Sequence, residues 1–429
     1  MVRQRFLVPS CTGSNPVNPI VLKEHPTRKK LAYGERFFLL KNTFLLKYVR
    51  LLFILRGDNV PRIVKVGAGG DEIDWKEALK NLRADDMLLL KPGFYELEQG
   101  ISACDVTIKG TGASPEDTVI DGYISVSPDS RYVTLENLTI NTVGERNALF
   151  IPYNADTYLT LRNCVIKTEI NENAAIALNG KCTVELYSCR VINGSVSFFS
   201  GSDFRLEMND SQIDYPVTDY CGLALEGIGT AIINNSTVNS SINTFSNTNI
   251  ELVINNSRLR DVHLAGQTWL NMLNCQIYSK EDNAFTSDDE CWLNIANSVF
   301  SGGMYLDGST TMLLQNSHCD RLMAIADTKT TMTNSLCKSH ADFQQNASCD
   351  ATRSTFNGSE EFEFFLAVNG EAEFKGHDII LNPNGATLAV QDDAIFRTNV
   401  LSSDQKALSV EYTNLPNVNI LGLKWEKRK

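Results

Sequence analysis

One short phrase recurs along the chain and limits the possible folds more than any other feature. In each copy two alternating apolar residues precede Asn, which is followed by Ser or Cys, a variable residue and another apolar residue. The matches recur at intervals of 18–26 residues, which is typical of solenoids whose repeats bury their apolar side chains against neighbouring repeats. The turn positions are Asn137, Asn163, Ser188, Asp210, Asn235, Asn256, Asn274, Asn297, Asn316, Asn334 and Arg353.

The residue types within each phrase predict the shape of one coil. The phrase reads as a short strand with period 2, a tight corner and a second short strand. Asn tolerates the positive φ that the corner requires, stacked Asn side chains are expected to bond to one another, and Ser or Cys is small enough to point inward. A third strand recurs between phrases, at Ala175–Asn179, Gly222–Glu226, Gly303–Asp307 and Leu322–Ala326.

Three strands and three corners per turn predict an all-β fold, a single-stranded right-handed parallel β-helix of about 12–13 coils. The variable spacing excludes a left-handed β-helix, which is built from strict hexapeptides. The leucine-rich repeat frame is absent, and the interval is too short for a β-propeller.

The solenoid domain is expected to span residues 61–429, with residues 61–84 as a capping segment. Asp74 and Glu77 resemble a capping box and predict a short amphipathic helix that ends at Arg83. A helix in this place would cover the open edge of the first coil.

Residues 1–60 form an N-terminal extension of doubtful status that lacks the repeat. The stretch from Arg36 to Arg56 is apolar but is interrupted by Lys41, Lys47 and Arg50. Three interpretations remain open: an amphipathic helix on a membrane surface, a helix docked on the end of the solenoid, or a true start near Val60. Membrane association is expected only under the first interpretation.

The composition restricts the partners and the compartment. A formal net charge of −12 argues against binding to a phosphate backbone, so nucleic acid is not an expected partner. Eleven cysteines without a C-x-x-C pair are interpreted as small buried thiols, which favour a reducing, cytoplasmic location. No coiled coil or intertwined tail is visible, so the oligomeric state stays open.

Four successive segments, Lys91–Tyr95, Val106–Gly110, Thr118–Gly122 and Val133–Ile140, resemble the opening coils of the pectin-lyase-like superfamily. The resemblance extends from about residue 85 to the end, and it implies the parallel β-helix fold. Secretion or the cell surface is the alternative location, because many members are secreted.

The superfamily includes pectate lyases, polygalacturonases and pectin esterases, and also proteins without an assigned activity. Of the polygalacturonase signatures only isolated Asp-Asp pairs occur here, and the pectin esterase signatures are absent. The resemblance therefore implies a fold without implying an activity.

The candidate site lies where the third strand ends. Strict alternation predicts that Met304, Leu306, Met323 and Ile325 point inward, like their counterparts on earlier coils, which are Ile176, Leu178, Leu223, Leu225, Val262 and Leu264. The outward neighbours are then Ala177, Ala224, His263, Tyr305 and Ala324, and the next outward positions are Asn179, Glu226, Asp288, Asp307 and Asp327.

Asp288, Asp307 and Asp327 are expected to form an acidic ladder on adjacent coils, about 5 Å apart by strand spacing. Such carboxylates suit either a Ca²⁺ site or the acid pair of a glycoside hydrolase. His263 and Tyr305 are candidate acid–base groups beside them. The alternative interpretation is that Asp is favoured in exposed turns.

Two hypotheses about function follow from these residues. The first is a binding scaffold that presents a surface to a carbohydrate or protein, with Glu226, Asp327, Trp269 and Trp292 as candidate ligand-binding residues. The second is a polysaccharide lyase or glycoside hydrolase that acts near Asp288 and Asp307. Neither hypothesis requires a cofactor, although Ca²⁺ is compatible with the second.

Overall fold

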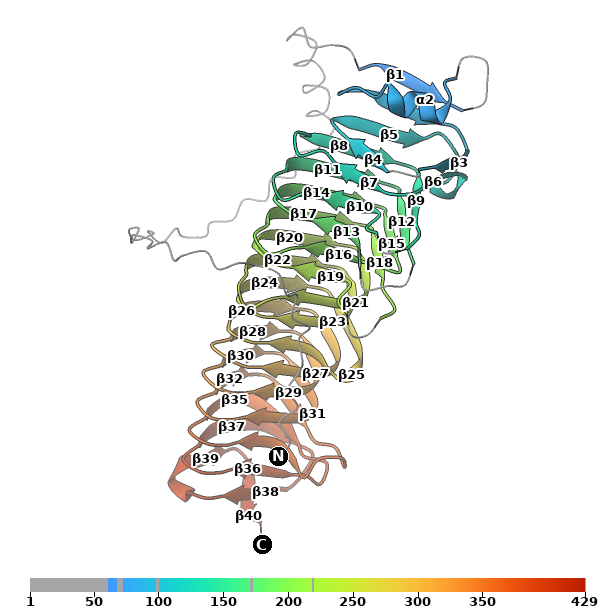
Figure 1. The fold of residues 1–429 in the computed structure, drawn as a ribbon. Helices are drawn as coiled ribbons and strands as arrows, with labels where there is room; N and C mark the ends of the chain where they lie inside the picture. Colours follow the sequence, from blue (N-terminus) through green and yellow to red (C-terminus); the bar gives the residue numbers. More distant parts are fainter. Residues whose placement is uncertain are drawn as a thin grey trace, which may run out of the picture. The chain divides into compact units, whose positions relative to one another are not determined.

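The computed structural model describes residues 61–67, 72–97, 100–144, 146–169, 173–217 and 220–428. They form a parallel β-solenoid of about 16 turns, which confirms the predicted fold class (Figure 1). The interpretations of residues 1–60 concern residues outside this set. Within the described part of the chain, no helix is long and apolar enough to cross a membrane.

The first strand of each coil belongs to one continuous parallel stack. Its members are β1 (Ile63–Val66), β2 (Met87–Leu90), β5 (Val106–Gly110), β8 (Tyr132–Glu136), β11 (Asp156–Arg162), β14 (Lys181–Tyr187), β17 (Asp203–Asn209), β20 (Ile228–Asn234), β22 (Asn249–Asn255), β24 (Gln267–Leu273), β26 (Glu290–Ala296), β28 (Thr311–Gln315), β30 (Lys329–Thr333), β32 (Ser348–Thr352), β35 (Glu373–Asn382), β37 (Ile395–Ser403) and β39 (Val418–Leu421). Strands β35 and β37 continue past the corner into the second stack.

The second and third stacks are separate at both ends of the solenoid. The second contains β3 (Gly93–Glu96), β6 (Thr118–Asp121), β9 (Thr139–Thr142), β12 (Val165–Thr168), β15 (Arg190–Ile192), β18 (Gln212–Asp214) and β33 (Thr355–Asn357). The third contains β4 (Ile101–Ala103), β7 (Ile124–Val126), β10 (Leu149–Ile151), β13 (Ala174–Leu178), β16 (Ser195–Phe198), β19 (Leu223–Leu225), β34 (Phe364–Val368), β36 (Thr387–Val390), β38 (Ala407–Tyr412) and β40 (Lys424–Lys427).

In the central coils one long strand bends and serves both of these stacks. These strands are β21 (Thr237–Thr244), β23 (Arg258–Leu264), β25 (Gln276–Ser287), β27 (Val299–Leu306), β29 (His318–Ala324) and β31 (Leu336–Phe343). The register shifts at the bend of each strand, and these bends position the hollow described below.

The predicted corners are confirmed at all eleven turn positions, where φ lies between 47° and 55°. Asn side chains stack between coils as expected: Asn163 donates to Asn137 at 2.7 Å, and Asn334 donates to Asn316 at 3.2 Å. The structure has more coils than the 12–13 predicted, because the end coils lack the Asn–Ser phrase by which coils were counted.

The Ser that follows the corner has a role beyond its small size. Ser211, Ser236, Ser298, Ser317 and Ser335 are buried, and each hydroxyl accepts the backbone N–H of the same position one coil earlier, at 3.0–3.3 Å. Each hydroxyl also donates to the carbonyl two residues before it. This serine ladder supplies partners to backbone groups beside the Asn corner that would otherwise be buried without a hydrogen bond.

Eight of the ten described cysteines are buried, as the composition indicated, whereas Cys104 and Cys221 are half-buried. Cys164, Cys189 and Cys275 occupy the serine-ladder position, and all ten described cysteines are free. Burial raises the pKa of Cys182 and of Cys291 to about 12, so both thiols stay protonated near neutral pH.

The capping segment contains a shorter helix than predicted, α2 (Trp75–Lys80). The Asp74 carboxylate accepts the N–H groups of Lys76 and Glu77, which is the predicted N-cap. The helix ends before Arg83, with Asn81 as its C-cap, whose side chain donates to the carbonyl of Glu77 at 3.1 Å. Two single-turn 3₁₀ helices, η1 (Pro115–Asp117) and η2 (Leu415–Asn417), lie in loops.

Candidate functional site: an exit corner and a hollow at the strand bend

Asp288 and Asp307 occupy the same position on adjacent coils, just after β25 and β27. We call this position, with the turn that follows it, the exit corner. The N–H of Asp288 bonds to the carbonyl of Leu264, and the N–H of Asp307 bonds to that of Ser287. The strands therefore place Asp288 and Asp307 next to each other, as the predicted acidic ladder requires for these two residues.

The predicted position of the third member, Asp327, was wrong. Leu306 pairs with Ala324, so Ile325 and not Asp327 follows Asp307 on the next coil. Asp327 lies further along, in a turn where its N–H bonds to the carbonyl of Gly308.

The inward and outward residues of β29 were also assigned wrongly, and that error arises at the bend of this strand. Leu322 and Ala324 are fully buried there, whereas Met323 pairs with the outward Tyr305, so the predicted inward set of Met323 and Ile325 was wrong. A single residue, Asp320, occupies this bend, whereas Ser301 and Gly302 occupy the bend of β27. One residue fewer in the bend moves every following side chain to the opposite face.

Each of the two exit-corner carboxylates accepts a hydrogen bond from a backbone N–H of its own turn. Asp288 Oδ1 accepts the N–H of Asp289 at 2.7 Å, and Asp307 Oδ1 accepts the N–H of Gly308 at 2.6 Å. Burial raises the pKa of Tyr305, and the negative charges of Asp307 and Asp288 raise it further. Tyr305 is therefore a protonated hydrogen-bond donor close to both carboxylates.

His263 and Glu226 lie on earlier coils. His263 pairs with Thr286, which in turn pairs with Tyr305, so two strand spacings, roughly 10 Å, separate His263 from Tyr305. Its Nδ1 is 2.9 Å from the hydroxyl oxygen of Thr286. Glu226 follows β19, three coils before Asp288, and burial raises its pKa.

Trp269 and Trp292 stack on each other across β24 and β26. Their ring centroids lie 4.6 Å apart, with an angle of 4° between the planes, and Trp269 is 37% exposed. Each ring therefore covers one face of the other. This arrangement stabilises neighbouring coils and leaves the ring edges for contacts with a ligand.

A second feature lies at the bends of the long strands. Residues of β25, β27, β29 and β31, together with the loop before β34, line an open hollow of about 510 Å³. We call it the bend hollow. Its lining residues are Ser279, Ser301, Gly302, Asp320, Arg321, Lys338, Ser339, Glu361 and Phe362.

The floor of the bend hollow is fixed by hydrogen bonds. Asp320 accepts from Lys338 Nζ at 2.8 Å and from the N–H of Gly302 at 2.9 Å. The hydroxyl of Ser339 donates to the carbonyl of Asp320 at 2.7 Å. Phe362 stacks on His340 at 4.8 Å between ring centroids, which holds the adjacent loop against β31.

The sequence interpretation missed this hollow because it considered only the exit of the third strand. Two signals were present in the sequence: the Gly302–Gly303 pair inside a strand, and charged residues directly before the third strand at Asp320, Arg321 and Lys338. Gly inside a strand often marks a bulge or a close approach of backbone.

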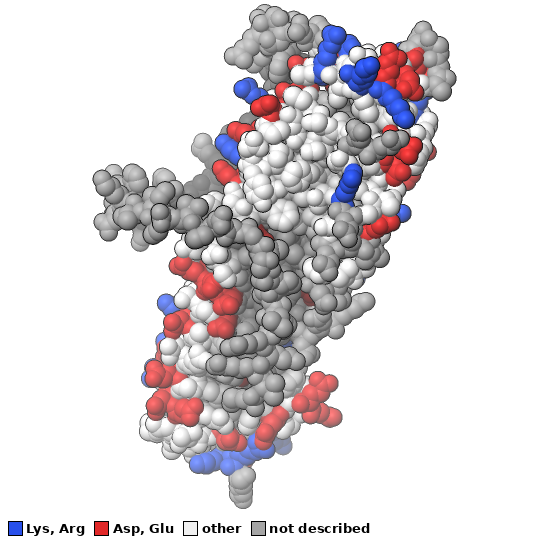
Figure 2. All heavy atoms as spheres, in the orientation of Figure 1, with Lys and Arg blue, Asp and Glu red and all other residues white. Residues whose placement is uncertain are grey.

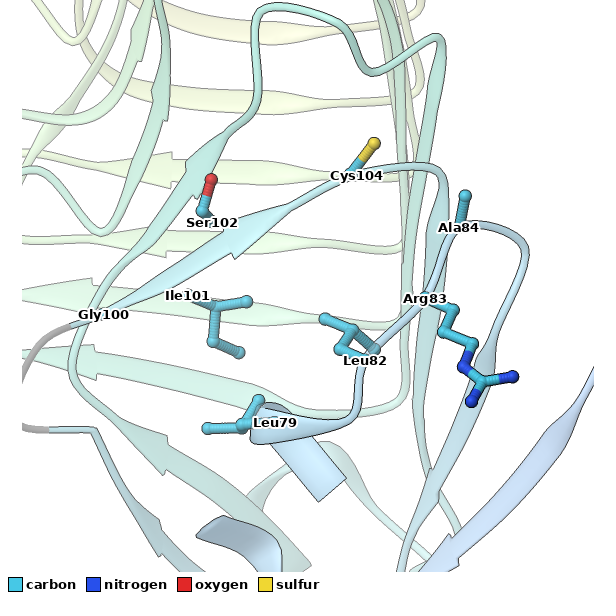
Figure 3. Close-up of a pocket in the computed structure, with 8 residues that line it drawn as sticks. All are labelled: Leu79, Leu82, Arg83, Ala84, Gly100, Ile101, Ser102 and Cys104. Atoms are coloured by element: carbon cyan, nitrogen blue, oxygen red, sulfur yellow. The ribbon is translucent and has the colours of Figure 1, made fainter. Parts of the chain in front are cut away.

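A smaller hollow of about 280 Å³ lies beside the cap (Figure 3). Leu79, Leu82 and Ile101 lie side by side there, and Arg83 is directed away from them. Burial is the main cause that raises the pKa of the nearby Cys104. The small, half-apolar lining offers few polar groups to orient a ligand.

The surface charge is uneven over the face in Figure 2. Carboxylates are numerous over its C-terminal half. The N-terminal cap carries both Lys or Arg and Asp or Glu, and a largely uncharged area lies just below it in this view. Among the described residues, no group of three or more His, Cys, Asp or Glu side chains is arranged to hold a metal ion.

The sequence matches no protein-family model, and no curated protein has a similar sequence. The observations that bear on function are therefore the parallel β-solenoid, the exit corner and the bend hollow.

Proposed function

We propose that this β-solenoid is a non-catalytic scaffold that binds carbohydrate in the bend hollow. The observation that carries the proposal is the hollow itself, whose volume of about 510 Å³ falls within the range of small-ligand sites. It is the larger of the two hollows and has the more polar lining.

The lining suits a ligand rich in hydroxyl groups. Ser301 and Ser339 provide hydroxyls, while Lys338 and Asp320 provide a charged donor and a charged acceptor on neighbouring coils. Phe362 adds an apolar ring at one side, against which the C–H groups of a sugar can pack.

Filling the hollow is expected to abolish this binding. Ser301 is exposed, so Ser301→Tyr adds a ring to the hollow without burying a new group in the core. We expect at least a tenfold loss of affinity, about 1.4 kcal/mol, for any glycan that the unmodified protein binds on a glycan array. The measurement is isothermal titration calorimetry with the purified protein.

The matched control is Thr311→Tyr, which places the same side chain on the exposed surface of β28. Its affinity should equal that of the unmodified protein. Equal affinity of both variants and the unmodified protein would place the binding site elsewhere, and no glycan binding at all would refute the proposal.

Catalysis at the exit corner is a second candidate function, favoured by one observation: Asp288 and Asp307 are adjacent and Tyr305 lies close to both. Carboxylates about 5 Å apart suit a retaining glycosidase. Under this hypothesis the Asp288→Asn/Asp307→Asn double variant loses release of reducing sugar from a polysaccharide panel, with and without Ca²⁺. If the unmodified protein releases no product, the scaffold function stands alone.

A further inference from the structure

The bend hollow lies between longer segments of chain at its two ends along the solenoid. In β27 two residues, Ser301 and Gly302, lie opposite the single bend residue of β29, Asp320. In β31 two residues, Lys338 and Ser339, again lie opposite Asp320. The three middle bends therefore contain only one or two residues each, and the hollow lies over them.

The neighbouring bends are longer on both sides. In β25, residues 279–282 separate Tyr278 and Asn283, whereas only Gly302 separates their partners on β27. Beyond β31, the six residues 358–363 join β33 to β34 and contribute Glu361 and Phe362 to the lining. The recess thus ends at a wider bulge on one side and at a loop on the other.

The extent of the recess limits the size of its occupant. From β25 to β31 there are three strand spacings, roughly 14 Å in total. The aromatic stack of Phe362 on His340 fixes the loop that forms one end. A polymer that continues along the solenoid axis meets this loop, whereas a short chain fits between the ends.

The charges of the lining are balanced. Arg321 and Lys338 are opposed by Asp320 and Glu361, and Lys338 is already paired with Asp320. A polyanionic chain therefore finds no net positive charge to offset its desolvation.

We propose that the bend hollow recognises the end of a neutral saccharide chain, or a free neutral oligosaccharide, and not the interior of a polysaccharide. The inference rests on the proposed carbohydrate-binding function and deepens it by naming the ligand class. The ligand enters across the recess, its terminal units lie over β27, β29 and β31, and Phe362 packs against one of its rings.

The test is the dependence of affinity on chain length. The probes are neutral oligosaccharides of glucose, mannose, galactose and N-acetylglucosamine, each from disaccharide to hexasaccharide, and polygalacturonate as the acidic polymer. Calorimetry is expected to show that the affinity for one series levels off by the trisaccharide and that polygalacturonate does not bind.

A second variant tests whether the loop that carries Phe362 limits the length of the ligand or only contributes to its affinity. Phe362→Ala removes part of the wall, so the hexasaccharide is expected to gain at least threefold in affinity relative to the trisaccharide. Phe199→Ala, an exposed aromatic residue outside the lining, is the control and should leave the length dependence unchanged.

The outcomes separate the two proposals. Affinity that rises with every unit up to the hexasaccharide in the unmodified protein, or tight binding of polygalacturonate, overturns the recognition of neutral chain ends but leaves carbohydrate binding intact. Absence of binding to every probe overturns both.

Discussion

Replacement of Phe374 by alanine is expected to lower the free energy of unfolding by about 3–5 kcal/mol. Phe374 is fully buried in β35, where its ring stacks on Phe396 at 4.9 Å between centroids and contacts Phe343 and Phe356. These four rings link successive coils, so the truncation removes packing between several of them at once. Urea denaturation followed by circular dichroism measures the loss.

The control for this prediction is the same truncation on the surface. Phe94 is 64% exposed on β3, so Phe94→Ala is expected to change stability by less than about 0.5 kcal/mol. Because each coil contacts mainly its neighbours, hydrogen exchange in Phe374→Ala should increase most in the coils around β35. Equal stability of the two variants would contradict the packing described here.

Replacement of Ser298 by alanine is expected to cost about 1–3 kcal/mol, although it removes a single oxygen atom. The hydroxyl accepts the N–H of Cys275 at 3.1 Å and donates to the carbonyl of Ala296 at 2.9 Å. Its removal leaves both backbone groups buried without these partners. Thermal unfolding of the variant measures the cost.

Two further substitutions test the serine ladder more sharply. Ser298→Cys should lose less stability than Ser298→Ala, because Cys occupies this position at Cys275 and Cys189 and retains a weak donor. Ser309→Ala, at an exposed turn, should be neutral. If Ser298→Ala is also neutral, the ladder contributes little to stability.

The positions of Asp288, Asp307 and Asp327 show where reasoning from the sequence succeeds and where it fails. Asp288 and Asp307 lie at the same position because the last residues of β25 and β27 pair in register, Ser287 with Leu306, although the bend of β25 is longer. Asp327 does not follow them: Leu306 pairs with Ala324, so Ile325 follows Asp307, and Asp327 lies two residues further along. The shorter bend of β29 accounts for one of these two positions. Alternation of apolar residues cannot reveal how many residues a bend contains.

The bend hollow also depends on the number of residues in each bend. Its recess exists because short bends in three coils lie between longer ones, and that comparison becomes possible only when the register between coils is known. The stacked Trp269 and Trp292 are a similar case. Their positions in the sequence left open whether the rings are exposed platforms for a sugar or pack at the strand ends, and strand pairing places them in contact with each other.

The sequence by itself determined the parallel β-solenoid, the corner residues and the inward Ser or Cys of each coil. These features are local, because a positive φ, a period of 2 and a small inward side chain each restrict the residue type at one position. The tertiary structure decided the register across the bends, the engagement of the exit-corner carboxylates with their turns, and the hollow. The register and the hollow depend on contacts between residues about 20 positions apart, whose alignment is set by the stacking of whole coils. The bonds of the two carboxylates are local, between neighbouring residues, and depend on the conformation that each turn adopts.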